Sequence, residues 1–458
     1  MKLYRVMLII SLLWLFLCVP SVASTSPTIS YLDVFDEILA TVDAHFYNGE
    51  SIPQDFVSRQ RTSRMQVKEL RFPQDQLLFS TTVNDLLARL HTSHTSYLSP
   101  QDPEYYHLAA VFSFRPAIQA LFDGQDIQYP TVGLLTERIE GRDFVVSVLP
   151  GGVAEKAGML SGDEIVAVGG RPYHPIDSLA TSVGREVSFT IQRQRHGSRQ
   201  TVAMTPVRLN PKLEMLEAER ASIRVISTQG KQIGYIHLYS YAGEEYHQEL
   251  ISALSWGDLK TCDAVIIDLR DGLGGADPSY LNLFNRQIPV ITSTDRTGNT
   301  SQYDPQLRKP TVYLVNHRTR SGKEILAFGA QQYHLATVIG ERTAGAVSGG
   351  QLFPLSNGDL LYLAVRASLV DGVKLEGVGV SPDIEVPQDI RYCEGRDVQI
   401  GRAVEFLLHE LQSSPCGKDV EACSRAITMR KPNINIHSDT IKLRSFLTTL
   451  HFAGDVKR

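Results

Sequence analysis

The feature that most constrains the fold is an alternation of short apolar runs and amphipathic segments that begins near Gln232. Four runs predict strands, at Ile233–Leu238, Ala264–Leu269, Thr311–Val315 and Ala336–Gly340. Helices are predicted between them at 246–254 and 325–333. A continuous apolar run is typical of a strand buried on both faces, and strands that alternate with helices favour parallel pairing. This part of the chain therefore predicts an α/β core.

The segments before this core have different patterns. Apolar residues at three- and four-residue steps predict a helix over Tyr31–Tyr47, and a second short helix is expected over Val83–Leu90. A polar turn, His91–Ser96, follows it directly. From Thr131 to Val207, short strands alternate with glycine-rich turns, which predicts a compact mixed unit.

The N-terminus has the layout of a secretory signal peptide. Lys2 and Arg5 precede an uncharged run, Val6–Val19, and small residues end at Ala23. That run is shorter than the roughly 20 residues of a membrane-spanning helix, which is the alternative interpretation. We expect cleavage after Ala23, with Ser24 as a close alternative, and hence an exported chain, periplasmic or secreted, without stable membrane insertion.

Charge and cysteine content narrow the possible partners. Lys and Arg number 45 and Asp and Glu number 50, so the net charge is −5 and no nucleic-acid partner is expected. In an oxidising compartment, one local disulfide among Cys393, Cys416 and Cys423 is plausible, whereas Cys262 is expected to be a buried free thiol. No metal-ligand spacing occurs, so we predict no metal and no cofactor.

Five sequence motifs carry a resemblance to a known family. Residues 148–170 read VLPGGVAEKAGMLSGDEIVAVGG, and the later motifs are IGYIHL, VIIDLRDGLGG, VNHRTRSGKEI with VIGERTAG, and LEGVGVSPDIEV. The first resembles a PDZ domain of the bacterial protease type. Together, and in this order, they resemble the C-terminal processing, or tail-specific, serine peptidase family.

The resemblance implies a mixed α/β fold with an inserted PDZ-like domain and a crotonase-like peptidase core. The expected organisation is a signal peptide (1–23), an N-terminal helical segment contributing the base (24–130), the PDZ-like domain (131–207), the α/β peptidase core (208–412) and a C-terminal tail of unassigned role (413–458).

The family's nucleophile corresponds to Ser321, which lies between a predicted strand and the helix that follows. Amides at a helix N-terminus favour a developing oxyanion, so the position suits a nucleophile. The alternative is that Ser321 is only a helix N-cap. By resemblance, the amides of Gly274 and Gly322 form the oxyanion hole, while Asp268 and Arg270 are expected to be a structural pair.

The base differs from that of the best-known members of the family. Ala346 stands where their lysine would be, and Gln332 stands where an auxiliary aspartate is common. The motif His91–Thr92–Ser93–His94 instead resembles the tricorn-like branch, in which a histidine is the base. The implied triad is Ser321, His94 and Glu376, with Glu376 acting directly or through Ser93.

Three other residues are rival bases: His91, Lys323 and Lys374. Lys323 is only two residues from Ser321 at a helix start, where the two side chains are expected to diverge. Because His94 must be neutral to act, a pH optimum near or above neutrality is expected.

The PDZ-like unit predicts a peptide-binding loop made of Val132, Gly133, Leu134 and Leu135. We therefore expect an exported serine endopeptidase that cleaves unstructured or C-terminal protein segments through an acyl-enzyme. The alternative is a catalytically inactive, peptidase-like scaffold that recognises peptide C-termini. A third, weaker interpretation is a cleft that binds a small ligand.

Overall fold

The computed structural model describes residues 29–304 and 306–413. The expected signal peptide, Cys416, Cys423 and nearly all of the C-terminal tail lie outside these ranges. In the described part of the chain, no helix has the length and apolar character needed to cross a bilayer. Cys262 is buried and free, as predicted, and Cys393 is also free.

The centre of the fold is a six-stranded sheet in the order β18-β15-β14-β11-β10-β9. All neighbouring pairs are parallel except β9 and β10. The strands are β9 (Arg224–Thr228), β10 (Lys231–His237), β11 (Ala264–Asp268), β14 (Thr311–Val315), β15 (Thr337–Gly340) and β18 (Ile384–Glu385). The four predicted core strands are confirmed, and β11 and β14, in which every residue is buried, lie in the middle of the sheet.

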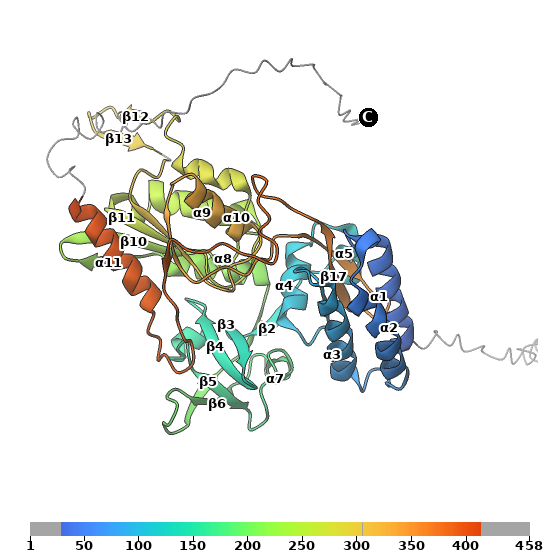
Figure 1. The fold of residues 1–458 in the computed structure, drawn as a ribbon. Coiled ribbons are helices and arrows are strands. Elements are labelled where there is room, and N and C mark those ends of the chain that lie inside the picture. Colours follow the sequence, from blue (N-terminus) through green and yellow to red (C-terminus); the bar gives the residue numbers. More distant parts are fainter. Residues whose placement is uncertain (1–28, 305, 414–458) are drawn as a thin grey trace, which may run out of the picture. The chain divides into compact units, whose positions relative to one another are not determined.

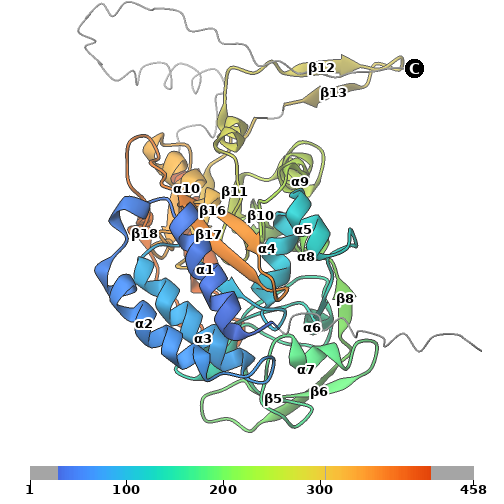
Figure 2. The ribbon, with the colours of Figure 1, turned by 90° about the vertical axis from the view of Figure 1, so that its right-hand side faces the viewer.

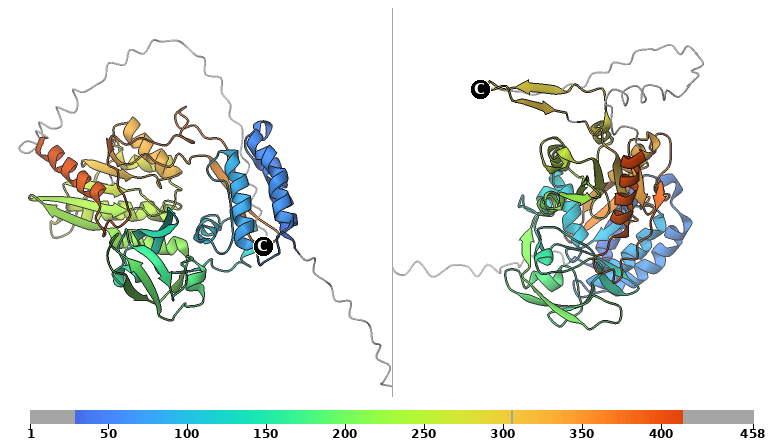
Figure 3. Two further views of the ribbon diagram at one scale, coloured as in Figure 1. Left: turned by 60° about the horizontal axis from the view of Figure 1, so that its bottom comes forward. Right: turned by 90° about the vertical axis from the view of Figure 1, so that its left-hand side faces the viewer.

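Helices cover both faces of this sheet (Figure 1). One face packs on α8 (Pro211–Ser222), α9 (Glu244–Ser255) and α10 (Gly322–Gln332). The other packs on Ala403, Leu407 and Leu408 of α11 (Val398–Ser413), which lies across the strands in the right-hand view of Figure 3. The predicted helices at 246–254 and 325–333 are therefore confirmed as α9 and α10, each beginning a little earlier.

A second, antiparallel sheet has the order β1-β17-β16. It joins β1 (Ser96–Leu98) to β16 (Gly349–Pro354) and β17 (Leu360–Arg366), with Ser96 opposite Tyr362. One face packs on the N-terminal helices, drawn in blue in Figure 1: α1 (Tyr31–His45), α2 (Gln54–Lys68) and α3 (Gln76–Leu87). The other packs on α4 (Pro103–Val111) and α5 (Pro116–Leu121). The N-terminal helices thus share one core with strands from much later in the chain.

The predicted helix at 31–47 is confirmed as α1, with a Ser30 cap. The helix expected at 83–90 begins earlier, at Gln76, and ends in a 3-10 turn at Ala88–Leu90. His91 follows in the left-handed conformation (φ 52°), which ends the helix.

The middle unit is a five-stranded antiparallel sheet in the order β3-β4-β5-β6-β7 with its own core. Its elements are β3 (Leu134–Ile139), β4 (Arg142–Val148), α6 (Val153–Lys156), β5 (Glu164–Val168), α7 (Asp177–Ala180), β6 (Val187–Gln192) and β7 (Gln200–Met204). β2 (Tyr129–Thr131) and β8 (Val207–Leu209) pair where the chain enters and leaves it. β3 is an edge strand of this sheet.

One hairpin was not predicted from the sequence. Strands β12 (Ile291–Thr294) and β13 (Thr300–Tyr303) pair with each other and are almost fully exposed. Figure 2 shows them extending away from the central sheet. At their base, Trp256 stacks on Tyr303 with ring centroids 5.1 Å apart.

Candidate active site

Ser321 lies in the tight connection between β14 and α10. Its backbone has φ 59° and ψ −132°, a conformation that costs energy for any residue other than glycine. Two hydrogen bonds hold it: the Ser321 amide donates to the Ala346 carbonyl at 2.9 Å and to Glu324 Oε2 at 3.2 Å. Strain of this kind gathers at functional sites, where the surrounding structure enforces it.

Glu324 is the anchor of this turn and was missed by the sequence analysis. It is fully buried, and its carboxylate accepts hydrogen bonds from Thr343 Oγ1 (2.5 Å) and from the amides of Gly345 and Ala346 (2.7 Å each). These bonds tie the turn at Ser321 to the loop that contains Ala346. The sequence does signal this, because Glu324 is the third helical residue after Ser321, the spacing of a capping box.

The loop after β11 brings Gly274 against Ser321. A Cβ atom at residue 274 would lie 2.5 Å from Ser321 Cβ and 2.8 Å from the Arg320 carbonyl oxygen, so only glycine fits. At Gly322, a Cβ atom would lie 2.3 Å from the Ala276 amide nitrogen. Within the described residues, neither glycine amide donates a hydrogen bond. Both amides therefore remain available to an oxyanion near Ser321.

His94 lies on the turn just before β1, with φ 54°. The pairing of β1 with β17 fixes this turn, and the His94 ring packs at 5.2 Å from that of Tyr362. His94 and Ser321 line one cavity of about 820 Å³. No direct hydrogen bond joins them in the part of the chain that the structure describes. Such bonds are often long in a free enzyme and tighten only when substrate is bound.

Ser93 links His94 to Glu376. Ser93 Oγ lies 2.8 Å from His94 Nδ1 and donates to Glu376 Oε2 at 2.9 Å. Because the single hydroxyl proton is used toward the carboxylate, Ser93 Oγ accepts from Nδ1, which must carry the imidazole proton. The remaining nitrogen, Nε2, is then the unprotonated one. The sequence left two possibilities, a direct contact between Glu376 and His94 or a contact through Ser93. The structure has the contact through Ser93.

Glu376 is held as an anion by backbone amides. It accepts hydrogen bonds from the amides of Ser93 (2.7 Å), Val347 (2.8 Å) and Ser348 (2.8 Å). Burial by itself would raise the pKa of Glu376, but these bonds outweigh it and the pKa is lowered. Val347 and Ser348 were not singled out in the sequence, since their contribution comes from main-chain amides.

The electrostatic environment keeps His94 neutral. Burial, followed by the guanidinium of Arg320, lowers the pKa of His94 to about 4, against the opposing effects of Glu376 and Glu104. Arg320 itself is paired with Glu104 at 2.9 Å. A neutral imidazole is the form that can accept a proton, and here it persists well below neutral pH.

The rival bases lie elsewhere. His91 is exposed and contacts Asp55 Oδ2 at 3.1 Å. Lys374 is exposed, and Lys323 is fully buried with Nζ donating to the carbonyl of Asp271 at 2.8 Å. Within the described chain, none of them bonds to the Ser321 hydroxyl. Ala346 lines the cavity, and Gln332 is exposed at the end of α10.

The PDZ-like unit supplies another wall of the same cavity. Val132, Leu134 and Leu135 line it, together with Tyr173 and Leu179 of the same unit. The Gly133 amide donates to Thr131 Oγ1 at 2.9 Å, so in this state it is not free for a ligand. β3, which contains Leu134 and Leu135, is an edge strand whose second side is unpaired within the described chain.

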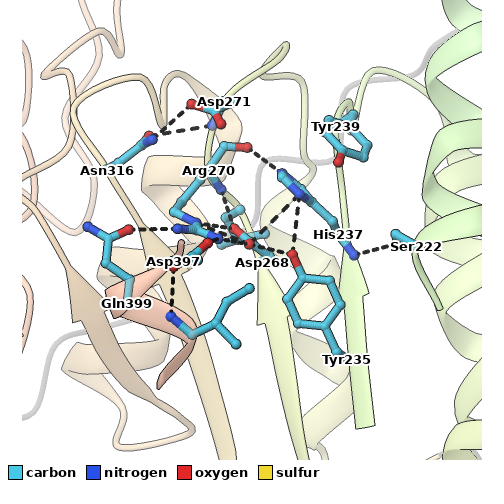
Figure 4. A network of polar contacts seen from close by, with 12 residues as sticks. Ser222, Tyr235, His237, Tyr239, Asp268, Arg270, Asp271, Asn316, Asp397 and Gln399 are labelled. Carbon is cyan, nitrogen blue, oxygen red and sulfur yellow. Dashed lines mark hydrogen bonds and ion pairs between the residues drawn. The ribbon is translucent and has the colours of Figure 1, made fainter. Parts of the chain in front are cut away.

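A separate polar network lies at the ends of β10 and β11 (Figure 4). Arg270 Nη2 contacts Asp268 Oδ2 at 2.6 Å and Asp397 at 2.7 Å, and its Nη1 donates to Gln399 at 2.8 Å. Burial opposes ionisation of Asp268, but Arg270 holds its pKa well below the usual range. The pair expected to be structural therefore ties the sheet to the start of α11.

A strained serine, two glycine amides that donate no hydrogen bond within the described residues, and a histidine linked to a carboxylate are the groups that a serine hydrolase requires. Two regions of the chain match the models of known families. Residues 232–386 match the model of peptidase family S41, and residues 144–193 match that of the PDZ domain. The chain is a serine peptidase that carries an S41 peptidase region and a PDZ domain.

Two relatives illustrate the similarity. The chain is 24% identical over 420 residues to the carboxy-terminal-processing protease of Bartonella bacilliformis, covering 86% of this chain and 88% of the relative. It is 27% identical over 351 residues to the carboxyl-terminal-processing protease of Picosynechococcus, covering 72% and 78%. A solved structure, the photosystem II D1 C-terminal processing protease, matches with 21% identity and a TM-score of 0.45, over 81% of this chain and 99% of that one.

Proposed function

We propose that this protein is an exported serine endopeptidase that cleaves unstructured or C-terminal protein segments through Ser321, His94 and Glu376. The hydrogen-bonded chain from His94 Nδ1 through Ser93 Oγ to Glu376 carries the proposal. In this proposal, segment 24–130 contributes the base, the PDZ-like unit 131–207 the peptide groove and the core 208–412 the nucleophile, with 413–458 left as a tail without an assigned role.

The reaction begins when Ser321 Oγ attacks the scissile carbonyl carbon and its proton passes to His94 Nε2. The carbonyl oxygen becomes an oxyanion that accepts hydrogen bonds from the amides of Gly274 and Gly322. When the tetrahedral intermediate collapses, the C–N bond breaks and the leaving amine takes the proton from His94. The acyl chain remains on Ser321 as an ester.

Water then hydrolyses the acyl-enzyme, with His94 and the two glycine amides in the same roles as before. His94 Nε2 takes a proton from the attacking water, and the oxyanion forms again beside the two glycine amides. Collapse breaks the ester bond, and His94 returns the proton to Ser321 Oγ. Throughout, Glu376 stabilises the imidazolium through Ser93, which keeps Nε2 directed at the reacting atoms.

The relatives are named carboxyl-terminal-processing proteases, and the PDZ groove supports a similar preference here. The open edge of β3 can add an extended peptide as a further strand, and Val132, Leu134 and Leu135 suit apolar side chains. Binding of a terminal carboxylate at Gly133 would require Thr131 Oγ1 to give up that amide. If Thr131 Oγ1 gives up the Gly133 amide, a peptide with an apolar C-terminus should bind more tightly as the free acid than as the C-terminal amide. If it does not, the free acid should have no advantage.

A fluorophosphonate probe tests the assignment of the nucleophile. At pH 8, wild type should be labelled, and mass spectrometry should place the adduct on Ser321. The Ser321→Ala variant should show no adduct and should not degrade fluorescein-labelled casein. A folded wild-type protein that is neither labelled nor active would favour the inactive scaffold instead.

Export rests on residues 1–23, which lie outside the described part of the chain. It is tested by expressing the full chain in a bacterium with a periplasm and sequencing the N-terminus of the product. A mature protein that begins at Ser24 in the periplasmic fraction is expected. An uncleaved N-terminus in the cytoplasmic fraction would contradict export and leave the chemistry untouched.

A further inference from the structure

Lys323 is a buried charged residue that the proposed mechanism does not use. It is the second residue of α10, two positions after Ser321, and its side chain is fully buried. Its Nζ donates to the carbonyl oxygen of Asp271 at 2.8 Å and lies 3.5 Å from that of Tyr239. Burying an amine is costly unless it makes hydrogen bonds, so these contacts demand an explanation.

One of the two carbonyls, that of Asp271, belongs to the loop that carries Gly274, and the other, that of Tyr239 after β10, is hydrogen-bonded to that loop. Asp271 begins this loop, and the Leu273 amide donates to the same Tyr239 carbonyl at 2.7 Å. At Gly272, with φ 65°, a Cβ atom would lie 1.9 Å from that oxygen, so the loop is packed tightly against it. The Lys323 side chain thus connects the start of α10, the helix that follows Ser321, to the first residue of the loop that carries Gly274.

We propose that Lys323 is a positioning residue that holds the two oxyanion donors at a fixed separation. Gly322 and Ser321 lie on one side of the link, at the start of α10, and Gly274 lies on the other. The inference rests on the proposed oxyanion hole. Donors must sit within a few tenths of an ångström of the developing charge, so a loose loop would weaken transition-state binding.

The surrounding charges are consistent with a link that works in either protonation state. Burial, which Asp271, Asp268 and Glu219 partly offset and Arg320 reinforces, lowers the pKa of Lys323 to about 7. Burial also raises the pKa of nearby Glu219 to about 9. A neutral amine still has two N–H groups, enough for both carbonyls.

The matched control is Lys309. Its Nζ also donates to two carbonyls, those of Leu259 (2.8 Å) and Lys260 (2.6 Å), but it lies outside the catalytic cavity. Replacing either lysine by methionine removes two similar hydrogen bonds and leaves an apolar side chain of similar length. A general loss of stability would therefore affect both variants.

The experiment measures fluorophosphonate inactivation at pH 8 in wild type, Lys323→Met, Lys323→Gln and Lys309→Met, with rates normalised to folded protein. Lys323→Met should lower the maximal inactivation rate by about 10- to 100-fold, somewhat less than outright removal of an oxyanion donor. The probe concentration at half-maximal rate should stay within about twofold, because ground-state binding does not use the hole. Lys323→Gln, which keeps a donor, should recover part of the rate.

Hydrogen exchange of residues 271–275 provides a readout that is independent of activity. Exchange should accelerate in Lys323→Met and not in Lys309→Met. A Lys323→Met protein with wild-type inactivation and wild-type loop exchange would overturn the inference; if that variant does not fold, Lys323→Gln is judged by the same two measurements. If wild type itself is not labelled, the proposed function fails, while accelerated loop exchange would still support the link.

Discussion

His237 and His94 both lie near a carboxylate, and their surroundings differ in one decisive way. His237 is 5% exposed, with Nδ1 3.8 Å from Asp268, and it stacks on Tyr239 at 3.8 Å. Its Nε2 donates to the Arg270 carbonyl at 2.9 Å. His94 reaches Glu376 through Ser93, and within the described residues its Nε2 has no hydrogen-bond partner.

The two carboxylates are also balanced differently. Asp268 is neutralised by the guanidinium of Arg270, whereas Glu376 is stabilised by neutral amides and a hydroxyl. An arginine partner leaves little negative charge to stabilise an imidazolium, while amide-held Glu376 keeps its charge available. We therefore expect a histidine near a carboxylate to act as a base only where one imidazole nitrogen lacks a hydrogen-bond partner and the residue lines a cavity, as His94 does within the described residues.

The largest contrast should appear when each histidine is removed. His94→Ala should lower kcat on casein by roughly 10⁴- to 10⁶-fold, because the serine loses its proton acceptor. His237→Ala should leave kcat per folded molecule within about threefold and lower the free energy of unfolding by about 1–3 kcal/mol. Denaturant unfolding and steady-state kinetics on both variants check this. Equal losses of kcat in both would contradict the contrast.

Neutralising each carboxylate is the next strongest comparison. Glu376→Gln should lower kcat by roughly 10²- to 10⁴-fold with little change in KM, because the histidine is no longer held in its productive tautomer. Asp268→Asn should retain kcat but lose about 3–5 kcal/mol of stability, since it leaves Arg270 buried without its main partner. A wild-type kcat in Glu376→Gln would refute the assigned role of this carboxylate.

A smaller effect is expected when the bridging hydroxyl is removed. Ser93→Ala leaves Glu376 with its three amide donors but cuts the contact to His94 Nδ1. We expect kcat to fall by roughly 10- to 100-fold, within the range of a general acid–base contribution. Ser58→Ala, an exposed hydroxyl on α2, is the matched control and should change nothing. Fluorophosphonate inactivation rates provide the measurement, and a Ser93→Ala rate equal to wild type would favour direct action of Glu376.

The smallest expected effect is on the pH dependence of kcat/KM and of stability. Because the pKa of His94 is lowered to about 4, its neutral form persists below pH 6.5, and the acid limb of kcat/KM should lie below that value. Since the unfolded state binds the proton first, stability falls as pH drops from 6.5 towards 4.

Arg320→Met should raise the pKa of His94 and move the acid limb of kcat/KM to higher pH. Arg64→Met, which removes an exposed ion pair with Asp36, is the control and should not shift it. The pH profile of kcat/KM checks this, and a shift to lower pH in Arg320→Met would contradict the sign.

The sequence predicts the parts of the fold that depend on local pattern. The apolar runs of β11 and β14 and the helix at 325–333 could be recognised because burial on both faces, or on one helical face, leaves a periodic signal. The pairing of β1 with β17 could not, since it joins distant segments whose register depends on the packed helices on both sides. That pairing is what brings the turn with His94 to the cavity.

The candidate site could likewise be predicted only in part from the sequence. The resemblance to the peptidase family pointed to Ser321, His94 and Glu376, but not to the amides of Val347 and Ser348, because a main-chain donor leaves no mark on residue type. Nor could it show that Lys323 is buried against the Asp271 carbonyl, which depends on how closely α10 approaches the loop after β11.

The proposed role of His94 as the base is tested most directly by determining the tautomers of His94 and His237. ¹⁵N NMR of histidine-labelled protein near pH 7.5, assigned with His94→Ala and His237→Ala, distinguishes a protonated from an unprotonated ring nitrogen. We expect His94 to carry its proton on Nδ1, which leaves Nε2 free to accept the proton of Ser321. We expect His237 to carry its proton on Nε2. A His94 with its proton on Nε2 would contradict the role of His94 as the base.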